Sequence, residues 1–81
     1  MNFSAIKLDS HAVEVVFTED AVRFVLVDGR EISAPLEWFP KLRDADDRKR
    51  NHWRLIGKGS GVHWPDLDED ISVSFLIHGR E

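Results

Sequence analysis

The first half of the chain alternates between apolar and polar positions with the period of β-strands. In residues 12–18, AVEVVFT, every second side chain is apolar, which predicts a strand. Residues 21–27, AVRFVLV, are apolar at nearly every position and suit a central strand covered on both faces. Residues 30–34, REISA, return as a third strand. The pattern predicts an antiparallel three-stranded meander.

The short turns between these strands predict their register. With Glu19-Asp20 as a two-residue turn, one apolar face contains three facing pairs: Val13 with Leu26, Val15 with Phe24, and Phe17 with Val22.

Asp28-Gly29 fits a type I′ turn, which places Val25 opposite Ile32 and Val27 opposite Arg30 on the reverse face, beside Val16 and Ala34. The predicted sheet therefore has two apolar faces. The second face must be covered by later segments, a second copy or a partner.

The second half of the chain predicts short helices and short extended segments. Pro35 ends the third strand, and residues 36–42 form an irregular or one-turn helical cap. A short helix is expected at about 45–53, with Asp44 or Asp46 as its N-cap. Extended stretches at 53–57 and 62–64 flank a glycine-rich turn, and a short C-terminal helix ends at Gly79. The predicted fold class is α+β.

Length and composition fit one small globular domain without an internal linker. The chain has 81 residues, of which 42% are hydrophobic and 32% charged. It contains no cysteine, so burial rather than disulfides must stabilise it. We see neither a targeting segment nor an apolar run of the roughly 20 residues that would span a bilayer, so a cytoplasmic protein without membrane contact is expected.

Charge is distributed unevenly along the chain. The formal net charge is −4, yet residues 41–58 contain seven Lys/Arg against three Asp. The following stretch GVHWPDLDEDISV contains four carboxylates, those of Asp66, Asp68, Glu69 and Asp70. Trp64 and Leu67 are expected to anchor this stretch to the core and Pro65 to bend it, so that the carboxylates point outward.

Several motifs resemble a bacterial family of unknown function, DUF2442, over roughly residues 10–79. They are Asp28-Gly29-Arg30, residues 35–42 (PLEWFPKL), Arg48 with Trp53-Arg54, residues 59–65 (GSGVHWP) and residues 67–73 (LDEDISV). The chain departs from the family pattern at Asp46-Asp47 and Ser74-Phe75. The resemblance implies a small α+β fold of no assigned activity. Members of the family resemble toxin–antitoxin-like partners of other small proteins, or domains fused to a helix-turn-helix module.

Sequence motifs for catalysis and metal binding are incomplete. Asp66, Asp68 and Asp70 match the first ligand positions of an EF-hand loop, but the required Gly and Glu are Ile71 and Ile77. A weak magnesium site on two of these carboxylates is the remaining metal alternative. Ser60, His63 and Asp66 have the residue types of a hydrolytic triad but lack a nucleophile elbow. We therefore predict no cofactor, no metal and no catalytic residue.

The preferred interpretation is a non-enzymatic protein-interaction or regulatory module, whose partner is another small protein or a second copy. The contact region is predicted at residues 63–70 and at the 48–54 helix end. Its candidate residues are Arg48, Arg54, His63, Trp64, Asp66, Asp68, Glu69 and Asp70.

Three alternatives stay open. The acidic residues could simply pair with Arg48 or Arg54 inside the monomer. A nucleic-acid-associated regulator, which the net charge disfavours, would need one continuous exposed basic stripe. A small RNA-acting enzyme would need His63 or His52 to converge with Lys58 or Arg54 in a cleft. The three tryptophans Trp38, Trp53 and Trp64 are expected to be core anchors.

Overall fold

The first half of the chain forms the predicted meander. The computed structural model describes residues 6–79. Strands β1 (Ala12–Phe17), β2 (Ala21–Leu26) and β3 (Glu31–Pro35) form an antiparallel sheet in the order β1-β2-β3. The three predicted strands are therefore confirmed, with bounds that differ by one residue at most.

The register between β1 and β2 follows the prediction except at Val13. Val15 pairs with Phe24 and Phe17 with Val22, as the Glu19-Asp20 turn requires. A β-bulge between Ala12 and Glu14 shifts the register, so Ala12 rather than Val13 pairs with Leu26. Ala12 is buried and Val13 is 48% exposed, so the predicted core position of Val13 is wrong.

The register between β2 and β3 differs from the prediction by one residue. Leu26 N donates to Arg30 O (2.8 Å) and Gly29 N donates to Leu26 O (3.0 Å), so residues 27–29 form the loop. Only Gly29 has a positive φ there (95°), whereas a type I′ turn requires positive φ at Asp28 as well. Phe24 therefore faces Ile32, and Val25 faces Glu31.

This shift removes the predicted second apolar face. A slip of one residue turns every side chain of a strand to the other face, so Ile32 and Ala34 join the core. The reverse face then mixes polar and apolar residues: Glu14, Val16, Ala21, Arg23, Val25, Glu31, Ser33 and Pro35. Arg23 Nε lies 3.7 Å from Glu31 Oε1 on that face. The expectation of two apolar faces, and of a cover for the second, is wrong.

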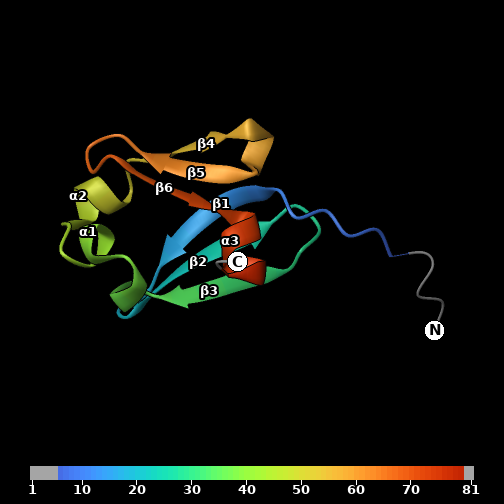
Figure 1. Cartoon of the computed structure of the whole chain (residues 1–81), viewed down its shortest axis with the longest axis horizontal. Helices are drawn as coiled ribbons and strands as arrows, with labels where there is room; N and C mark the ends of the chain where they lie inside the picture. The colour runs from blue at the N-terminus through green and yellow to red at the C-terminus, as the bar shows by residue number, and fades with distance from the viewer. Residues whose placement is uncertain (1–5, 80–81) are drawn as a thin grey trace.

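The second half of the chain forms a second antiparallel sheet, which the sequence predicted only as extended segments. Strands β4 (Arg54–Ile56), β5 (Gly61–Trp64) and β6 (Glu69–Ser72) pair in the order β4-β5-β6. Figure 1 shows this sheet stacked over the first. Glu69 and Asp70, which were expected in a loop, begin β6 instead.

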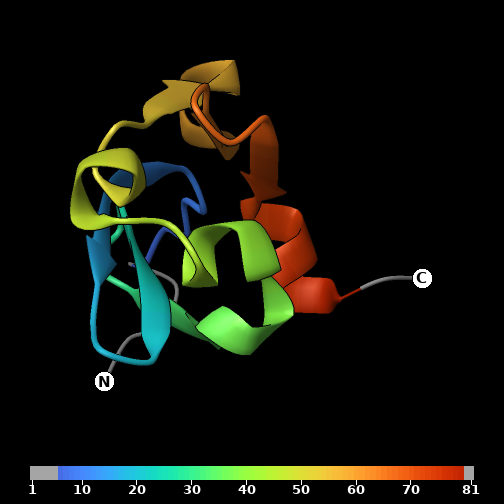
Figure 2. The same ribbon diagram turned by 90° about the vertical axis from the view of Figure 1, so that its left-hand side faces the viewer.

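Short helical segments connect and close the two sheets. They are η2 (Leu36–Trp38), α1 (Pro40–Arg43), α2 (Asp47–Arg50), η3 (Gly57–Gly59) and α3 (Val73–His78). The helix predicted at 45–53 is shorter, but Asp46 is its N-cap and accepts from Lys49 N at 2.9 Å. The C-terminal helix is confirmed, with Ser72 and Gly79 as its caps. Figures 1 and 2 show α1 and α2 together at one end of the sheets.

One core fills the space between the sheets. Its largest fully buried side chains are those of Trp64, Phe24, Leu26, Leu42, Val22, Val62 and Val73. Trp64 is a core anchor as predicted, and Trp53 is partly buried against the core. Trp38 is 58% exposed, so its predicted core position is wrong. The short 3₁₀ turn of η2 buries Leu36 and leaves Trp38 at the surface.

Candidate functional site

The turn between β5 and β6 is fixed to the core by two apolar side chains. Trp64 pairs with Glu69 across the turn, and Trp64 is fully buried while Leu67 packs against the core. Leu67 N donates to Trp64 O at 3.2 Å, and Asp68 adopts a positive φ of 49°, which aspartate tolerates better than most residues. The predicted anchoring by Trp64 and Leu67 is therefore present, and Asp66 and Asp68 are exposed on a defined turn.

A row of three polar side chains crosses the second sheet. Arg54 pairs with His63, and His63 pairs with Asp70. Their neighbours Val62 and Ile71 are buried, so alternation places the row on the face away from the core. His63 Nδ1 lies 2.5 Å from Asp70 Oδ1, with 21% of the His63 side chain and 66% of the Asp70 side chain exposed.

A second histidine–carboxylate pair lies at the turn. His52 Nδ1 is 2.7 Å from Asp66 Oδ2. The hydrogen bond to His52 holds the pKa of Asp66 below its usual value, with smaller contributions from the charges of His52, Arg48 and Lys49. Two of the four carboxylates of the acidic stretch are thus matched with histidines.

Arg48 and Arg54 do not neutralise the acidic stretch. Within residues 6–79, neither arginine forms an ion pair with Asp66, Asp68, Glu69 or Asp70. Both arginines are exposed. The contact of Asp68 with a cation is through its backbone, because its carbonyl oxygen accepts a hydrogen bond from Lys41 Nζ at 3.2 Å. Arg48 and Lys49 therefore lie near enough to lower the pKa of Asp66 through their charge, without forming an ion pair with it.

The residues of the incomplete triad motif do not come together. Ser60 Oγ donates to Ile56 O at 3.4 Å, His63 contacts Asp70, and Asp66 contacts His52. In the part of the chain that the structure describes, no three His, Cys, Asp or Glu side chains are grouped closely enough to hold a metal ion.

The basic residues of 41–58 do not form one stripe. The Arg50 guanidinium points inward and donates to Leu42 O (2.9 Å) and Arg43 O (2.7 Å). Arg43 is paired with Glu37 and Asp44, at 3.1 Å and 3.0 Å. Lys41 is held at the carbonyl of Asp68. Of the seven basic residues, these contacts leave four without an ion pair or a side-chain hydrogen bond among the described residues: Arg48, Arg54 and Lys58, which are exposed, and Lys49, which is half-buried.

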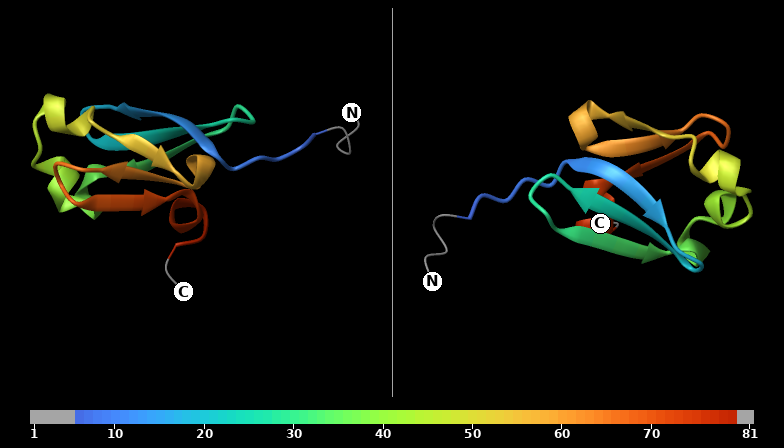
Figure 3. Two further views of the ribbon diagram at one scale, coloured as in Figure 1. Left: turned by 90° about the horizontal axis from the view of Figure 1, so that it is seen from above. Right: turned by 180° about the vertical axis from the view of Figure 1, so that it is seen from behind.

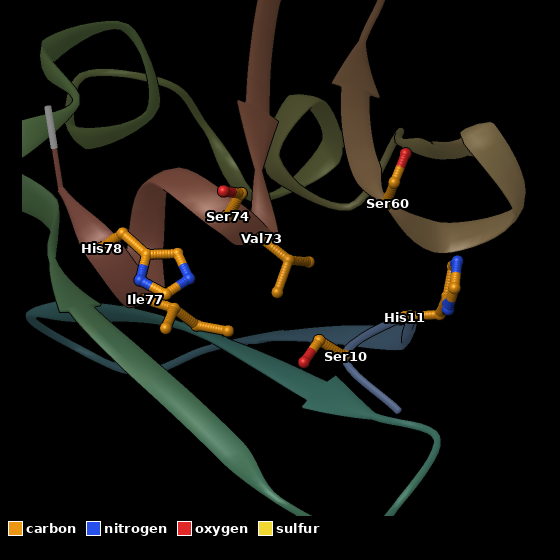
Figure 4. A pocket seen from close by; sticks show the side chains of 7 residues that line it. All are labelled: Ser10, His11, Ser60, Val73, Ser74, Ile77 and His78. Carbon is orange, nitrogen blue, oxygen red and sulfur yellow. The ribbon is translucent and has the colours of Figure 1, made fainter. Parts of the chain in front are cut away.

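Sequence reasoning missed two hollows on the surface. One, of about 230 Å³, is lined by Ser10, His11, Ser60, Val73, Ser74, Ile77 and His78 (Figure 4). Its serines and histidines come from three separate segments, so no local motif could reveal it. Ser10 Oγ accepts from Arg30 and His11 Nδ1 contacts Asp9, so these two polar groups already have partners inside the chain.

The other hollow, the aromatic groove, runs along β6 and is lined by Trp38, Phe39, Phe75 and residues 69–72. Its volume is about 440 Å³. The sequence offered one signal for it, the aromatic pair Trp38-Phe39, but the expectation that Trp38 is a core anchor pointed away from a surface groove.

The fold and this surface define a small α+β domain of two antiparallel meanders that carries a histidine-paired acidic hairpin. The family model for proteins of unknown function, DUF2442, matches residues 12–81, and the chain belongs to that family. The resemblance seen in the sequence is therefore confirmed. No curated protein matches the chain.

Two solved structures are similar to the chain. A crystal structure of a protein of unknown function from Rhodospirillum rubrum is 27% identical, with a TM-score of 0.71, covering 85% of this chain and 86% of that one. An NMR structure of an uncharacterized protein from Chromobacterium violaceum is 24% identical, with a TM-score of 0.73, covering 86% of this chain and 66% of that one. The second likeness shows the fold alone. Among residues 6–79 there is no helix of the length and apolar character needed to cross a membrane.

Proposed function

We propose that the chain is a non-enzymatic protein-interaction module, and that its partner is another small protein, in the manner of an antitoxin-like or regulatory partner. The contact surface is the outer side of the β5–β6 hairpin with the neighbouring cations. It contains Arg48, Arg54, His63, Asp66, Asp68 and Asp70. Glu69 pairs with the buried Trp64 and lies half-buried at the rim of this surface, which Trp64 anchors from the core side.

The observation that carries this proposal is that the hairpin is firmly anchored to the core while no lysine or arginine side chain pairs with its carboxylates among the described residues. The hairpin is fixed from below by the fully buried Trp64. Within the described residues, the carboxylates of Asp68 and Glu69 nevertheless form no ion pair, and those of Asp66 and Asp70 contact only histidines. Carboxylates that are fixed in place, and that no lysine or arginine of the described residues neutralises, favour electrostatic selection of a partner.

The geometry gives less support to the two other function classes. Nucleic-acid binding relies on a continuous basic surface, and here Arg50, Arg43 and Lys41 are engaged inside the chain. An RNA-acting site would need its histidines in a cleft, whereas neither His52 nor His63 lines the two hollows described above.

Affinity capture with charge-matched variants tests the proposal. The variant D68N/D70N removes two carboxylates from the hairpin, and asparagine retains the tolerance for positive φ that position 68 needs. The control E14Q/E19Q makes the same charge change at exposed positions in β1 and in the β1–β2 turn. A partner captured from native cells should be retained by the wild type and the control and lost by D68N/D70N. Equal retention by all three would overturn the proposed contact surface.

A further inference from the structure

Among the described residues, the outer edge of β6 has backbone groups without a hydrogen-bond partner. β6 is the outermost strand of the second sheet, as Figure 3 (left) shows. Val73 N donates to Ser60 O at 2.9 Å, which fixes the alternation of the antiparallel ladder. Val62 and Ile71 then form a hydrogen-bonded pair, whereas His63 and Asp70 form a non-hydrogen-bonded one. The N–H and C=O of Asp70 and the N–H of Ser72 therefore point away from β5.

An aromatic surface borders this edge. The Trp38 and Phe39 rings are 6.4 Å apart and the Phe39 and Phe75 rings 6.3 Å apart, both edge to face. Trp38 is 58% and Phe75 36% exposed, although both belong to residue types that usually bury most of their surface. Together with residues 69–72 they line the aromatic groove. A free strand edge and an apolar groove thus lie side by side.

The charge of β6 and the number of its free backbone groups limit what can occupy the groove. Asp70 is exposed on the outer side of β6, and Asp68 and Glu69 precede it. At the turn end, Lys41 Nζ already occupies the carbonyl of Asp68, so further pairing is confined to Asp70 and Ser72. The site is therefore short, acidic on its outer side and aromatic beside the edge.

We propose that the aromatic groove binds an extended segment of the partner protein by β-strand addition to β6. The segment alternates apolar and Lys/Arg side chains: the apolar ones lie against Trp38 and Phe75, and the basic ones face Asp70 and its neighbours. This inference rests on the proposed function and specifies the chemistry of the partner. A second copy of the chain does not fit, because edge-to-edge pairing of two β6 strands would bring like charges together.

Synthetic peptides test the binding mode directly. The probe is a fluorescein-labelled octapeptide that alternates lysine and isoleucine, with blocked ends. Its comparators are the same peptide with glutamate for lysine, and the lysine peptide with alternate backbone amides N-methylated. The full chain should bind the lysine peptide saturably, bind the methylated peptide about tenfold or more weakly, and not bind the glutamate peptide. Equal binding of the methylated peptide would exclude strand addition.

Two variants at one position separate the backbone from the charge. D70N removes the carboxylate only, whereas D70P also removes the outward N–H. That N–H takes no part in the β5 ladder, so proline is tolerated at this edge. D70P should bind the lysine peptide at least about tenfold more weakly than D70N. Equal binding by both variants would overturn the proposal. An amide spectrum of D70P that retains the wild-type pattern serves as the check on folding.

The aromatic side of the groove has its own matched pair of variants. W38A should weaken binding of the lysine peptide about tenfold, whereas V27A, at an apolar site 52% exposed in the β2–β3 turn, should leave it unchanged. Amide shifts caused by the peptide should centre on residues 69–75, and shifts centred elsewhere would count against the groove. A cellular partner that is lost by D68N/D70N, is captured equally by D70N and D70P, and is unaffected by W38A would overturn strand addition and leave the proposed function standing.

Discussion

The indole of Trp64 donates a hydrogen bond to the backbone carbonyl of Arg50 at 2.9 Å. Through this bond, β5 of the second sheet is fixed to the end of α2. The Arg50 guanidinium in turn donates to the carbonyls of Leu42 and Arg43 at the end of α1, and lies 5.6 Å from the centre of the Phe17 ring. Trp64 and Arg50 thus connect the two sheets with helices α1 and α2 at one point.

Replacing Trp64 by phenylalanine should destabilise the protein strongly. W64F leaves the Arg50 carbonyl without its indole donor and opens a cavity beside Phe17 and Phe24, whose rings are 6.3 Å and 6.4 Å from that of Trp64. The expected loss in unfolding free energy is about 2–4 kcal/mol, measured by urea denaturation. W38F, at a site 58% exposed, should change the same quantity by about 0.5 kcal/mol or less.

Lysine cannot replace Arg50. R50K loses the planar fork that reaches Leu42 and Arg43 together, so the unfolding free energy should fall by about 1–3 kcal/mol. R48K alters an exposed side chain two positions earlier on the same helix and should be nearly neutral. Equal melting temperatures for the two variants would contradict the inward role of Arg50.

Gly59 should tolerate no side chain. Its φ is +104°, and a Cβ there would lie 2.4 Å from the carbonyl oxygen of Ala12 at the start of β1. Gly29 has a similar φ of +95° but open space around it. G29A should therefore cost about 1 kcal/mol from backbone strain, and G59A about 3 kcal/mol or more from strain plus steric overlap. Thermal unfolding of the two variants measures the difference, and similar losses would show that the contact with Ala12 relaxes freely.

The carboxylate of Asp28 should contribute to stability in a pH-dependent way. Its hydrogen bonds from the Arg30 side chain and from the backbone of Asp9 and Arg30 lower its pKa from 3.8 to about 2. Because the folded-state pKa lies below the unfolded one, the contribution is fully present above about pH 5 and is lost as the pH falls toward 2. D28N should thus be less stable than the wild type at about pH 7, and the gap should narrow at about pH 2. Urea denaturation at both values checks this, and a gap that does not change with pH would contradict it.

The sequence predicted the strands and the hairpin order well, because apolar alternation marks them directly. It could not determine the β2–β3 register, since Val27-Asp28-Gly29 supports a turn of two or of three residues equally. Only the hydrogen bond from Leu26 N to Arg30 O decides between them. The bulge at Val13 was equally invisible, because Ala12 and Val13 are both apolar and either could face the core.

The sequence predicted the anchored hairpin that carries the candidate residues, but it did not predict which side chains these residues contact. Trp64 and Leu67 marked the anchored hairpin, since large apolar residues flank the acidic positions. The matching of His52 with Asp66 and of His63 with Asp70 depends on the pairing of β5 with β6 and on the path of the chain after α2. In short strands with few apolar residues, the alternation of apolar and polar positions is too brief to predict such pairing. The position of Phe75 beside Phe39 depends on the packing of α3 and had no local signal.

Within residues 6–79, every strand pairs only with strands next to it in sequence. Each meander can therefore assemble from local hairpins, with small loop-closure entropy and low contact order. Distant parts of the chain are joined when the two meanders dock and the ring of Trp64 meets the rings of Phe17 and Phe24. Because the two sheets share no backbone ladder, the cooperativity between them depends on side-chain packing.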